Sequence, residues 1–542
     1  MKLKSKNFQV KSKKAKVKSM KRIKDSVLSI KQKVFVVLLF TFYFLLFTFA
    51  PSLVSAQTET PPAPSVAKSV KIPAVKAKTL PNKLQVVVVQ RKNVPLVTVQ
   101  LLVKSGAETE DFDKAGLANM TASLLTKGTK TRTATQIAEQ MEFLGGSINS
   151  GAGWNNSIVS INVMADKLDA AMAIMADVVL NPKFDQKELD LLKSQTLDGL
   201  NFNLKQPGFL ANYVATAYSF SEHPAGGTPD TINLIKRDDI VNFHKEYFEP
   251  QDTILIFTGD ITAVKANALA QKYFGKWKNP IVQPEPIGEI IQRLEETPES
   301  MSARKQEEMQ QPLVKRILVV DLPNSGQAAV SFAKYVEGGG RIVWDEKKDA
   351  GVISEGYYPA LVLNSLLGGG YSSRLNQEIR IKRGLSYGAG SSFAWRFYKT
   401  NFATRTQTKN ESAAEVAELV IEELKKLSDG KIADTELNPR KLVLTGGFGR
   451  NLETTNGLAA AIADLYSFEL STSELNTYMN SVNAVSDAQI QKFAGENLKG
   501  GDIIIVGDAK IFMDDLKKRF PNQKIEVIKA DELDLSKENL RK

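Results

Sequence analysis

The chain has 542 residues, of which 43% are hydrophobic and 24% charged, a composition typical of globular proteins with more than one core. It has no cysteine, which excludes structural disulfides, thiolate metal sites and a cysteine nucleophile. Residues 1–33 hold 13 of the 71 basic residues and one acid, so the net charge of +11 comes from this segment, and the other 58 basic and 59 acidic residues nearly cancel. We therefore infer no nucleic-acid binding, which needs a basic face on the folded domain.

The N-terminus has the layout of a secretory signal. A lysine-rich segment is followed by the uncharged apolar run 34–50, and then by the small-residue cleavage site Val54-Ser55-Ala56. We expect a signal peptide over residues 1–56, cleaved after Ala56, and a body exported to the periplasm or cell envelope. The alternative is an uncleaved membrane anchor through 34–50, whose length lies at the lower limit for spanning a bilayer.

The Pro-rich segment 57–79 predicts an extended tether, and a first globular domain is expected over residues 80–280. Two apolar strands joined by a polar turn predict a β-hairpin at its start. The expected elements are strands 84–89 and 96–103, helices 113–127 and 135–144, strands 147–150 and 156–163, helices 167–180 and 186–204, and strand 253–259.

A segment rich in Pro, Glu and Gln predicts a linker over 281–311, followed by a second domain over 312–530 and a charged tail over 531–542. The expected elements of the second domain are the strand pair 316–321 and 328–335, helices 358–367 and 373–382, strands 387–394 and 401–408, helices 413–427 and 434–452, and strand 503–506. Both halves begin with strands, continue with helix pairs and end with a strand. This order indicates a duplicated α+β unit.

Few residues could hold a metal ion. Zinc hydrolases bind the metal through imidazole or carboxylate ligands and also need a general base. The chain has two histidines, His223 and His244, and neither HExxH nor HxxEH occurs in it. We interpret both histidines as ordinary, partly buried or turn residues and predict no metal site in this chain.

The segment 116–129, GLANMTASLLTKGT, resembles the zinc-binding segment G-x-A-H-F-L-E-H-M-x-F-K-G-T of the pitrilysin and mitochondrial processing peptidase family of insulinase-like zinc peptidases. Asn119 stands in place of the first zinc histidine, Ala122 in place of the catalytic glutamate and Ser123 in place of the second histidine. Positions i, i+3 and i+4 share one face of a helix, so the resemblance implies a degenerate zinc site there. The family's third ligand, a glutamate, falls at Gly199, beside Asp198.

In the second half, LGGGYSSRL at 367–375 and RIKRGLSY at 380–387 are similar to the family pattern LGGGxSSRLxxxxREKRGLAY. The resemblance assigns to Arg380 and Tyr387 the family's role of binding the substrate backbone and stabilising the oxyanion, which suits fixed hydrogen-bond donors. The alternative is structural, with Arg380 on a helix surface and Tyr387 packed at a strand end. No GK[ST] follows the glycines, which disfavours nucleotide binding. The resemblance offers Gly368, Gly369 and Gly370 only a weak analogy to a substrate-contacting loop.

Over residues 80–508 the resemblance implies two homologous α+β domains, each with an antiparallel-rich sheet and packed helices, joined by the linker into a clam-like half-chamber. It also implies a catalytically incomplete subunit of a heterodimeric zinc metallopeptidase, inactive alone. A homologous HxxEH partner would hold the zinc, and this chain would hold no cofactor. The substrate would be a peptide or unfolded segment in the cell envelope. The alternative is a non-catalytic scaffold or peptide-binding protein of the same fold.

Overall fold

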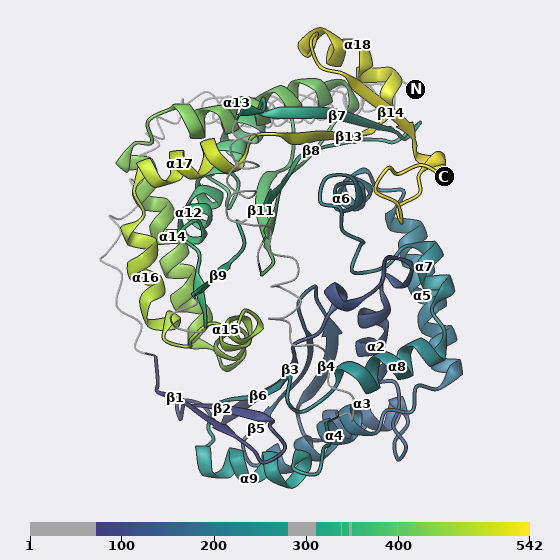
Figure 1. Ribbon diagram of the computed structural model, residues 1–542, viewed down its shortest axis with the longest axis vertical. Coiled ribbons are helices and arrows are strands. Elements are labelled where there is room, and N and C mark those ends of the chain that lie inside the picture. The colour runs from purple at the N-terminus through teal and green to yellow at the C-terminus, as the bar shows by residue number, and fades with distance from the viewer. Residues whose placement is uncertain (1–71, 280–309, 338, 346–349, 398) are drawn as a thin grey trace, which may run out of the picture. The chain divides into compact units, whose positions relative to one another are not determined.

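The computed structural model describes residues 72–279, 310–337, 339–345, 350–397 and 399–542 (Figure 1). The predicted signal segment 1–56 and nearly all of the linker 281–311 lie outside these residues. The described part belongs to one compact unit, Ala67–Lys542. It contains two six-stranded sheets with helices packed on them, which confirms the predicted α+β class. Within the described ranges, no helix is both long and apolar enough to cross a bilayer.

The first sheet has the order β1 (Val75–Thr79), β2 (Gln85–Gln90), β6 (Thr253–Gly259), β3 (Leu96–Val103), β5 (Ser157–Met164) and β4 (Ser147–Ala152). The predicted hairpin of β2 and β3 is wrong, because β6 lies between them, parallel to β2 and antiparallel to β3. Every residue of β6 is buried, as expected for a strand covered on both faces. The predicted tether 57–79 is also too long, since β1 pairs with β2.

The second sheet repeats this arrangement. Its order is β14 (Ile525–Lys529), β7 (Val314–Asp321), β13 (Gly501–Gly507), β8 (Ala328–Glu337), β12 (Lys399–Thr408) and β11 (Ala389–Trp395). The fully buried β13 separates β7 from β8, so the predicted strand pair is wrong for the same reason as in the first sheet. The five strands from β7 to β11 match β2, β6, β3, β5 and β4 in order and direction, which supports the duplication.

The helices follow the predicted positions where predictions were made. In the first half they are α2 (Leu117–Leu125), α3 (Ala134–Phe143), α4 (Leu168–Leu180), α5 (Gln186–Asn203), α6 (Pro207–Tyr218), α7 (Pro229–Leu234), α8 (Arg237–Tyr247) and α9 (Ala263–Phe274). In the second half they are α12 (Tyr357–Leu367), the π-helix η3 (Asn376–Lys382), α13 (Ala413–Asp429), α14 (Asp434–Glu453), α15 (Thr455–Ser467), α16 (Glu474–Ala484), α17 (Asp487–Asn497) and α18 (Ala509–Arg519). A small hairpin, β9 (Ile342–Asp345) and β10 (Ala350–Ile353), precedes α12.

Each half contributes one helix to the sheet of the other half. Helix α6 of the first half packs on β8, β13 and β12 of the second sheet, and Ser219, at its end, donates a 2.8 Å hydrogen bond to Asp502. Helix α15 of the second half packs on β3 and β6 of the first sheet. Its Leu458 and Ile462 share a buried cluster with sheet residues such as Ile254. The two sheets are therefore joined by exchanged helices as well as by the linker.

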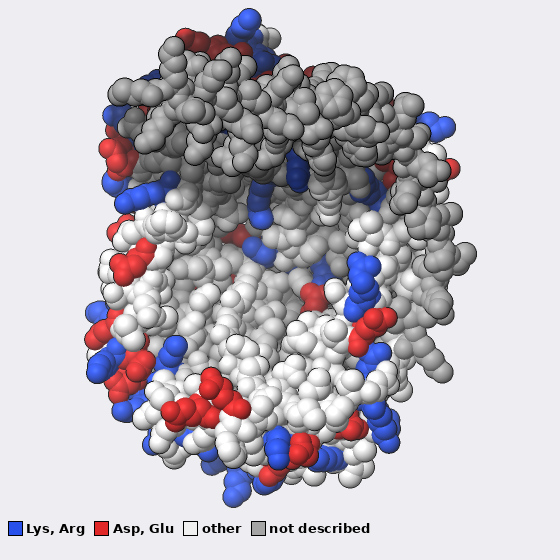
Figure 2. Space-filling model, turned by 180° about the vertical axis from the view of Figure 1, so that it is seen from behind, with Lys and Arg blue, Asp and Glu red and all other residues white. Residues whose placement is uncertain are grey.

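The predicted charged tail, 531–542, is an ordered part of the fold. Leu535 and Leu540 are buried, and Arg541 forms a 2.9 Å ion pair with Glu526 of β14. Elsewhere, positive and negative side chains are interspersed around the face shown in Figure 2. That mixture agrees with the near-neutral composition of the chain after residue 33.

Candidate active-site remnant and substrate-facing residues

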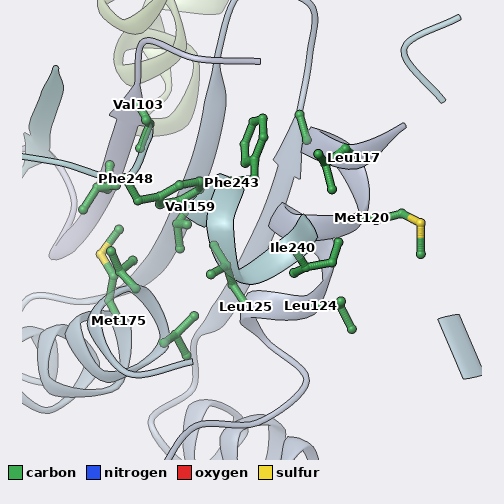
Figure 3. Packing of buried hydrophobic residues seen from close by; sticks show 14 of the residues in the cluster. Val103, Leu117, Met120, Leu124, Leu125, Val159, Met175, Ile240, Phe243 and Phe248 are labelled. Carbon is green, nitrogen blue, oxygen red and sulfur yellow. The ribbon is translucent and has the colours of Figure 1, made fainter. Parts of the chain in front are cut away.

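Helix α2 is held in the core of the first half by its apolar side. Leu117, Met120 and Leu124 are buried, close to Ile240 and Phe243 of α8 (Figure 3). The helix starts at Gly116, whose φ of +97° lies in the left-handed region that favours glycine. The Gly116 and Ala118 N–H groups donate to the buried Glu110 carboxylate. Burial raises the pKa of Glu110 to about 8, and these N–H groups oppose the shift.

The three degenerate zinc positions on α2 have different surroundings. Asn119 and Ser123 are half-buried, and the Ser123 hydroxyl donates to Asn119 Oδ1 at 3.4 Å. Ala122 is only 1% exposed, and its carbonyl accepts a 2.7 Å hydrogen bond from Ser150 on the neighbouring strand β4. Asn119 and Ser123 can therefore reach a ligand, whereas the side chain at 122 faces packed protein.

The position that the resemblance assigns to the third ligand lies on α5, which packs against α2. A Cβ at Gly199 would meet nothing within 4 Å, so the space for a longer side chain is open. Asp198, beside it, is exposed. The side chains at positions 119, 122, 123 and 199 supply neither an imidazole nor a general base. In the described parts of the chain, no group of three His, Cys, Asp or Glu side chains is placed to hold a metal ion.

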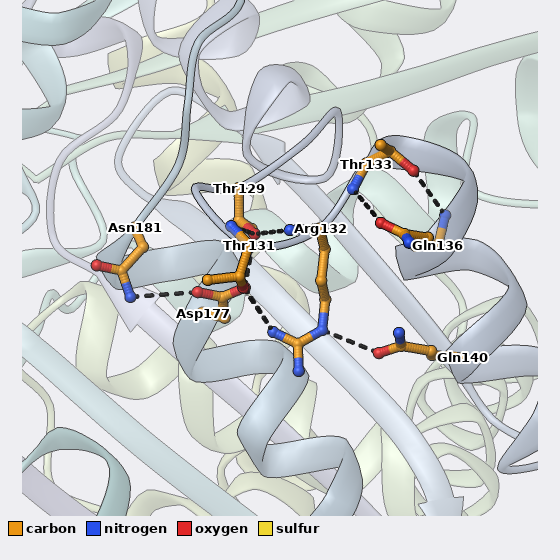
Figure 4. Close-up of polar contacts among 8 residues, drawn as sticks. All are labelled: Thr129, Thr131, Arg132, Thr133, Gln136, Gln140, Asp177 and Asn181. Carbon is orange, nitrogen blue, oxygen red and sulfur yellow. Dashed lines mark hydrogen bonds and ion pairs between the residues drawn. The ribbon is translucent and has the colours of Figure 1, made fainter.

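The residues that follow α2 have a structural role. Gly128 adopts a φ of +130°, and the Thr129 hydroxyl donates to Asp177 of α4 at 2.6 Å (Figure 4). Thr131 and Arg132 also donate to this carboxylate, at 2.8 and 2.6 Å. Burial alone would raise the pKa of Asp177, but these hydrogen bonds outweigh it and hold the pKa below its usual range. The Gly-Thr pair that carries the resemblance thus fixes α2 against α4.

His223 is buried and His244 is half-buried, and both belong to the packing of the first half. His223 Nδ1 lies 3.8 Å from Glu110 Oε2, and burial lowers the pKa of His223. His244 Nε2 donates to the Val179 carbonyl at 2.8 Å, and burial lowers the pKa of His244 to about 4. The His244 ring also stacks on Phe248. These surroundings agree with the interpretation of both residues as ordinary structural histidines.

Arg380 and Tyr387 lie on either side of the turn between η3 and β11. Residues 376–382 form a π-helix where an α-helix was predicted, and such segments frequently occur at functional sites. The Arg380 guanidinium lies over the Tyr371 ring, 4.8 Å from its centroid. No carboxylate of the described residues lies within 4 Å of this guanidinium. Tyr387 is 91% exposed, which contradicts the alternative that it packs at a strand end.

The glycine run 368–370 forms a tight turn at the end of α12. The N–H groups of Gly368 and Gly369 donate to the Asn364 carbonyl at 2.9 and 2.7 Å. A Cβ at Gly368 would collide with the backbone of β11, so glycine is required there for packing, while Gly370 faces open space. The exposed side chain of this turn is Tyr371, at 63%. A substrate contact by the glycine loop stays a prediction.

The turn is also fixed from α14. Arg374 forms two 2.8 Å hydrogen bonds with Glu436, and Arg440 donates to the Ser372 carbonyl and hydroxyl. Tyr387 lies at a groove of about 470 Å³ between α6 and the strands β8 and β12. This groove could not be predicted from the sequence, because α6 carries no recognised motif and its packing on the second sheet is a tertiary feature.

Comparisons with known proteins agree with the fold and the motifs. The sequence model described as "Insulinase (Peptidase family M16)" matches residues 85–220, and the one described as "Peptidase M16 inactive domain" matches residues 235–444. An uncharacterized zinc protease of Mycobacterium leprae is 25% identical over 382 residues, which cover 70% of this chain and 79% of the relative. An uncharacterized zinc protease of Bacillus subtilis is 22% identical over 386 residues, which cover 70% and 85%.

Solved structures show the same fold. The crystal structure of a peptidase M16 inactive domain from Pseudomonas fluorescens has a TM-score of 0.67 and 21% identity, and the match covers 80% of this chain and 98% of that one. A protease from Helicobacter pylori has a TM-score of 0.68 and 22% identity, with coverage of 80% and 100%.

The first family match lies within the first half, and the second begins before α8 of the first half and extends to α14 of the second. The inactive-domain match and the side chains at 119, 122, 123 and 199 fit a catalytically incomplete pitrilysin-like protein. The chain belongs to the insulinase-like peptidase family M16.

Proposed function

We propose that this chain is the substrate-binding, zinc-free subunit of a heterodimeric metallopeptidase of the cell envelope. Its partner would be a homologous chain with an intact HxxEH helix. This chain would contribute Arg380 and Tyr387 to the shared site and hydrolyse nothing alone. The substrate would be a peptide or an unfolded segment of a protein.

The observation that carries the proposal is the contrast between the two candidate sites. At the zinc positions, Ala122 and Gly199 have no functional group, and Asn119 and Ser123 hydrogen-bond to each other. At the other site, the Tyr387 phenol is free in solvent and the Arg380 guanidinium faces an aromatic ring instead of a carboxylate. Exposed donors that make no structural hydrogen bond are available to a ligand.

These two donors suit the charge that develops during peptide hydrolysis. A phenol O–H and a guanidinium N–H can both donate to the oxygen of a scissile carbonyl, and they stabilise it more as it gains negative charge. Zinc, held by the partner, would polarise the same carbonyl. Arg380 and Tyr387 would also orient the substrate backbone.

The test is to purify the tagged chain from its own cells, identify co-purifying proteins and measure chelator-sensitive peptide hydrolysis. We expect a stoichiometric HxxEH partner, and a loss of activity of about 10²-fold or more in Tyr387→Phe, typical of a lost oxyanion donor. Tyr273→Phe is the matched control, because this hydroxyl donates to the Asp169 carbonyl on α4, in the first half and away from Arg380 and Tyr387. Zinc-free protein with no such partner and no hydrolysis would favour the scaffold or peptide-binding alternative.

A further inference from the structure

The groove beside Tyr387 has one wall from each half of the chain. Phe209 and Asn212 of α6 form one side, and Ser331 of β8 and Arg405 of β12 form the other. Its volume of about 470 Å³ is in the range of sites that bind small ligands or a few residues of a peptide. Tyr387 and Gly388 line the same groove, so it is continuous with the exposed tyrosine.

Arg405 is the one charged side chain among the described residues that line this groove. It is exposed, and its neighbour on β11 is Gly390, which has no side chain to cover it. No carboxylate in the described ranges lies within 4 Å of its guanidinium. A guanidinium with five donors and no anionic partner, set among uncharged groups, favours the binding of a carboxylate.

The cavity at the other end of α6 provides a contrast. It has a volume of about 820 Å³ and is also lined by several cationic side chains, including Arg316 and Arg541. There, however, Arg316 pairs with Asp502 at 2.7 Å and Arg541 pairs with Glu526 at 2.9 Å. Both arginines of that cavity have anionic partners within the protein, whereas Arg405 has none among the described residues.

We propose that the groove between α6 and β12 is a subsite for a peptide carboxylate, with Arg405 as the recognising residue. The carboxylate belongs either to an acidic side chain or to the free C-terminus of a peptide whose backbone passes Tyr387. The inference deepens the proposed function and rests on it in taking a peptide as the ligand. It does not require the partner subunit, because every group involved lies on this chain.

The experiment is calorimetric titration of the full mature chain with four versions of one short peptide. They carry a central Glu or Gln, each with a free or an amidated C-terminus. We expect peptides with the recognised carboxylate to bind more tightly than peptides without it. Comparing Glu with Gln tests the side-chain carboxylate, and comparing the free with the amidated C-terminus tests the terminal carboxylate. Arg405→Gln should weaken that binding about tenfold, the usual loss for a charged hydrogen bond, and Arg405→Lys should weaken it less. Arg450→Gln on α14, exposed and outside the groove, is the control.

Equal binding of all four peptides, no binding of any, or equal affinities of Arg405→Gln and Arg450→Gln would overturn the proposal. The result is separable from the proposed function. If a zinc-binding partner co-purifies and hydrolysis depends on Tyr387, but Arg405→Gln does not change peptide binding, the subsite proposal fails and the proposed function stands. If peptide binding depends on the carboxylate and on Arg405, but no zinc-binding partner is found, the subsite proposal stands and the heterodimeric peptidase proposal fails.

Discussion

At the scale of single residues, the Arg380 guanidinium depends on Tyr371 for its position. The ring lies 4.8 Å from the guanidinium, and a cation–π contact of this kind contributes about 0.5–1 kcal/mol at an exposed site. The side chain at 371 thus determines how well Arg380 is oriented before substrate arrives.

We therefore predict that Tyr371→Ala lowers kcat/KM of the assembled peptidase by about two- to fivefold, the equivalent of that contact. Tyr371→Phe keeps the aromatic face and should retain activity. Steady-state kinetics on the purified complex measures both. Equal losses in the two variants would point to the hydroxyl instead of the ring.

A second residue-scale prediction concerns pH. The pKa of His244 is about 4 in the folded chain and about 6.5 when unfolded, so between these values only the unfolded state takes up the proton. Stability contributed by neutral His244 is therefore lost as pH falls from about 6.5 to 4, with a slope of up to ~1.4 kcal/mol per pH unit. Urea unfolding of His244→Gln, which does not titrate, should show a shallower dependence. An unchanged slope would contradict the burial argument.

Candidate site residues could be identified from the sequence only where they belong to a motif of the family. Asn119, Ala122 and Ser123 were located from the segment around Gly116, and the structure places all three on α2. Their unequal burial could not be foreseen, because it depends on β4 packing beside position 122. Arg405 belongs to no motif, and whether a carboxylate among the described residues reaches it depends on which strands and helices meet around it.

At the scale of elements, α2 and α5 pack against each other, and they carry the four positions that the resemblance assigns to a degenerate zinc site. Position 122 is closed by β4, whereas Asn119 and Ser123 are half-buried and a Cβ at Gly199 would meet nothing within 4 Å. Side chains with imidazole or carboxylate groups should fit at these three positions without displacing the core.

We predict that the triple variant Asn119→His, Ser123→His and Gly199→Glu binds Zn²⁺ stoichiometrically, because it supplies a three-ligand set of the kind found in catalytic zinc sites. Metal analysis after dialysis measures this, with the unaltered chain as the control. A triple variant that is free of zinc after dialysis would show that α2 and α5 are too far apart to bind one metal ion together.

Ala122→Glu alone should lower the free energy of unfolding by about 2–4 kcal/mol, because it buries a carboxylate without a partner.

Most strands and helices could be predicted from periodicity, but their pairing could not. Alternation and apolar runs locate β2, β3, β7 and β8, and adjacency in sequence favours hairpins. The strands β6 and β13, in which every residue is buried, occupy the positions between them and are covered on both faces. This pairing joins segments that lie far apart in the sequence, so it leaves no local signal.

At the scale of the whole described unit, α6 and α15 couple the stabilities of the two sheets, because each of these helices packs on the sheet of the other half. Ile462 of α15 is fully buried in the cluster that covers one face of the first sheet. The Thr455 hydroxyl lies 2.8 Å from the Thr98 hydroxyl, and the Thr455 carbonyl accepts from Thr258 at 2.7 Å. Neither sheet is covered on both faces by its own half alone.

We therefore predict that Ile462→Ala lowers the free energy of unfolding by about 2–5 kcal/mol, the usual cost of such a core truncation. Both halves should lose stability together, in a single transition followed by calorimetry and by hydrogen exchange of each sheet. Ala460→Ser, an exposed change on the same helix, should have little effect. Two separate transitions, with only the second half destabilised, would contradict the coupling.

The exchanged helices also constrain the order of events during synthesis. When β6 leaves the ribosome, the first sheet has all its strands, but the face that α15 covers is bare and apolar until the second half has been translated. A nascent chain with this apolar face exposed should bind holdase chaperones. Chains stalled on the ribosome before Thr455 should therefore co-purify with such chaperones.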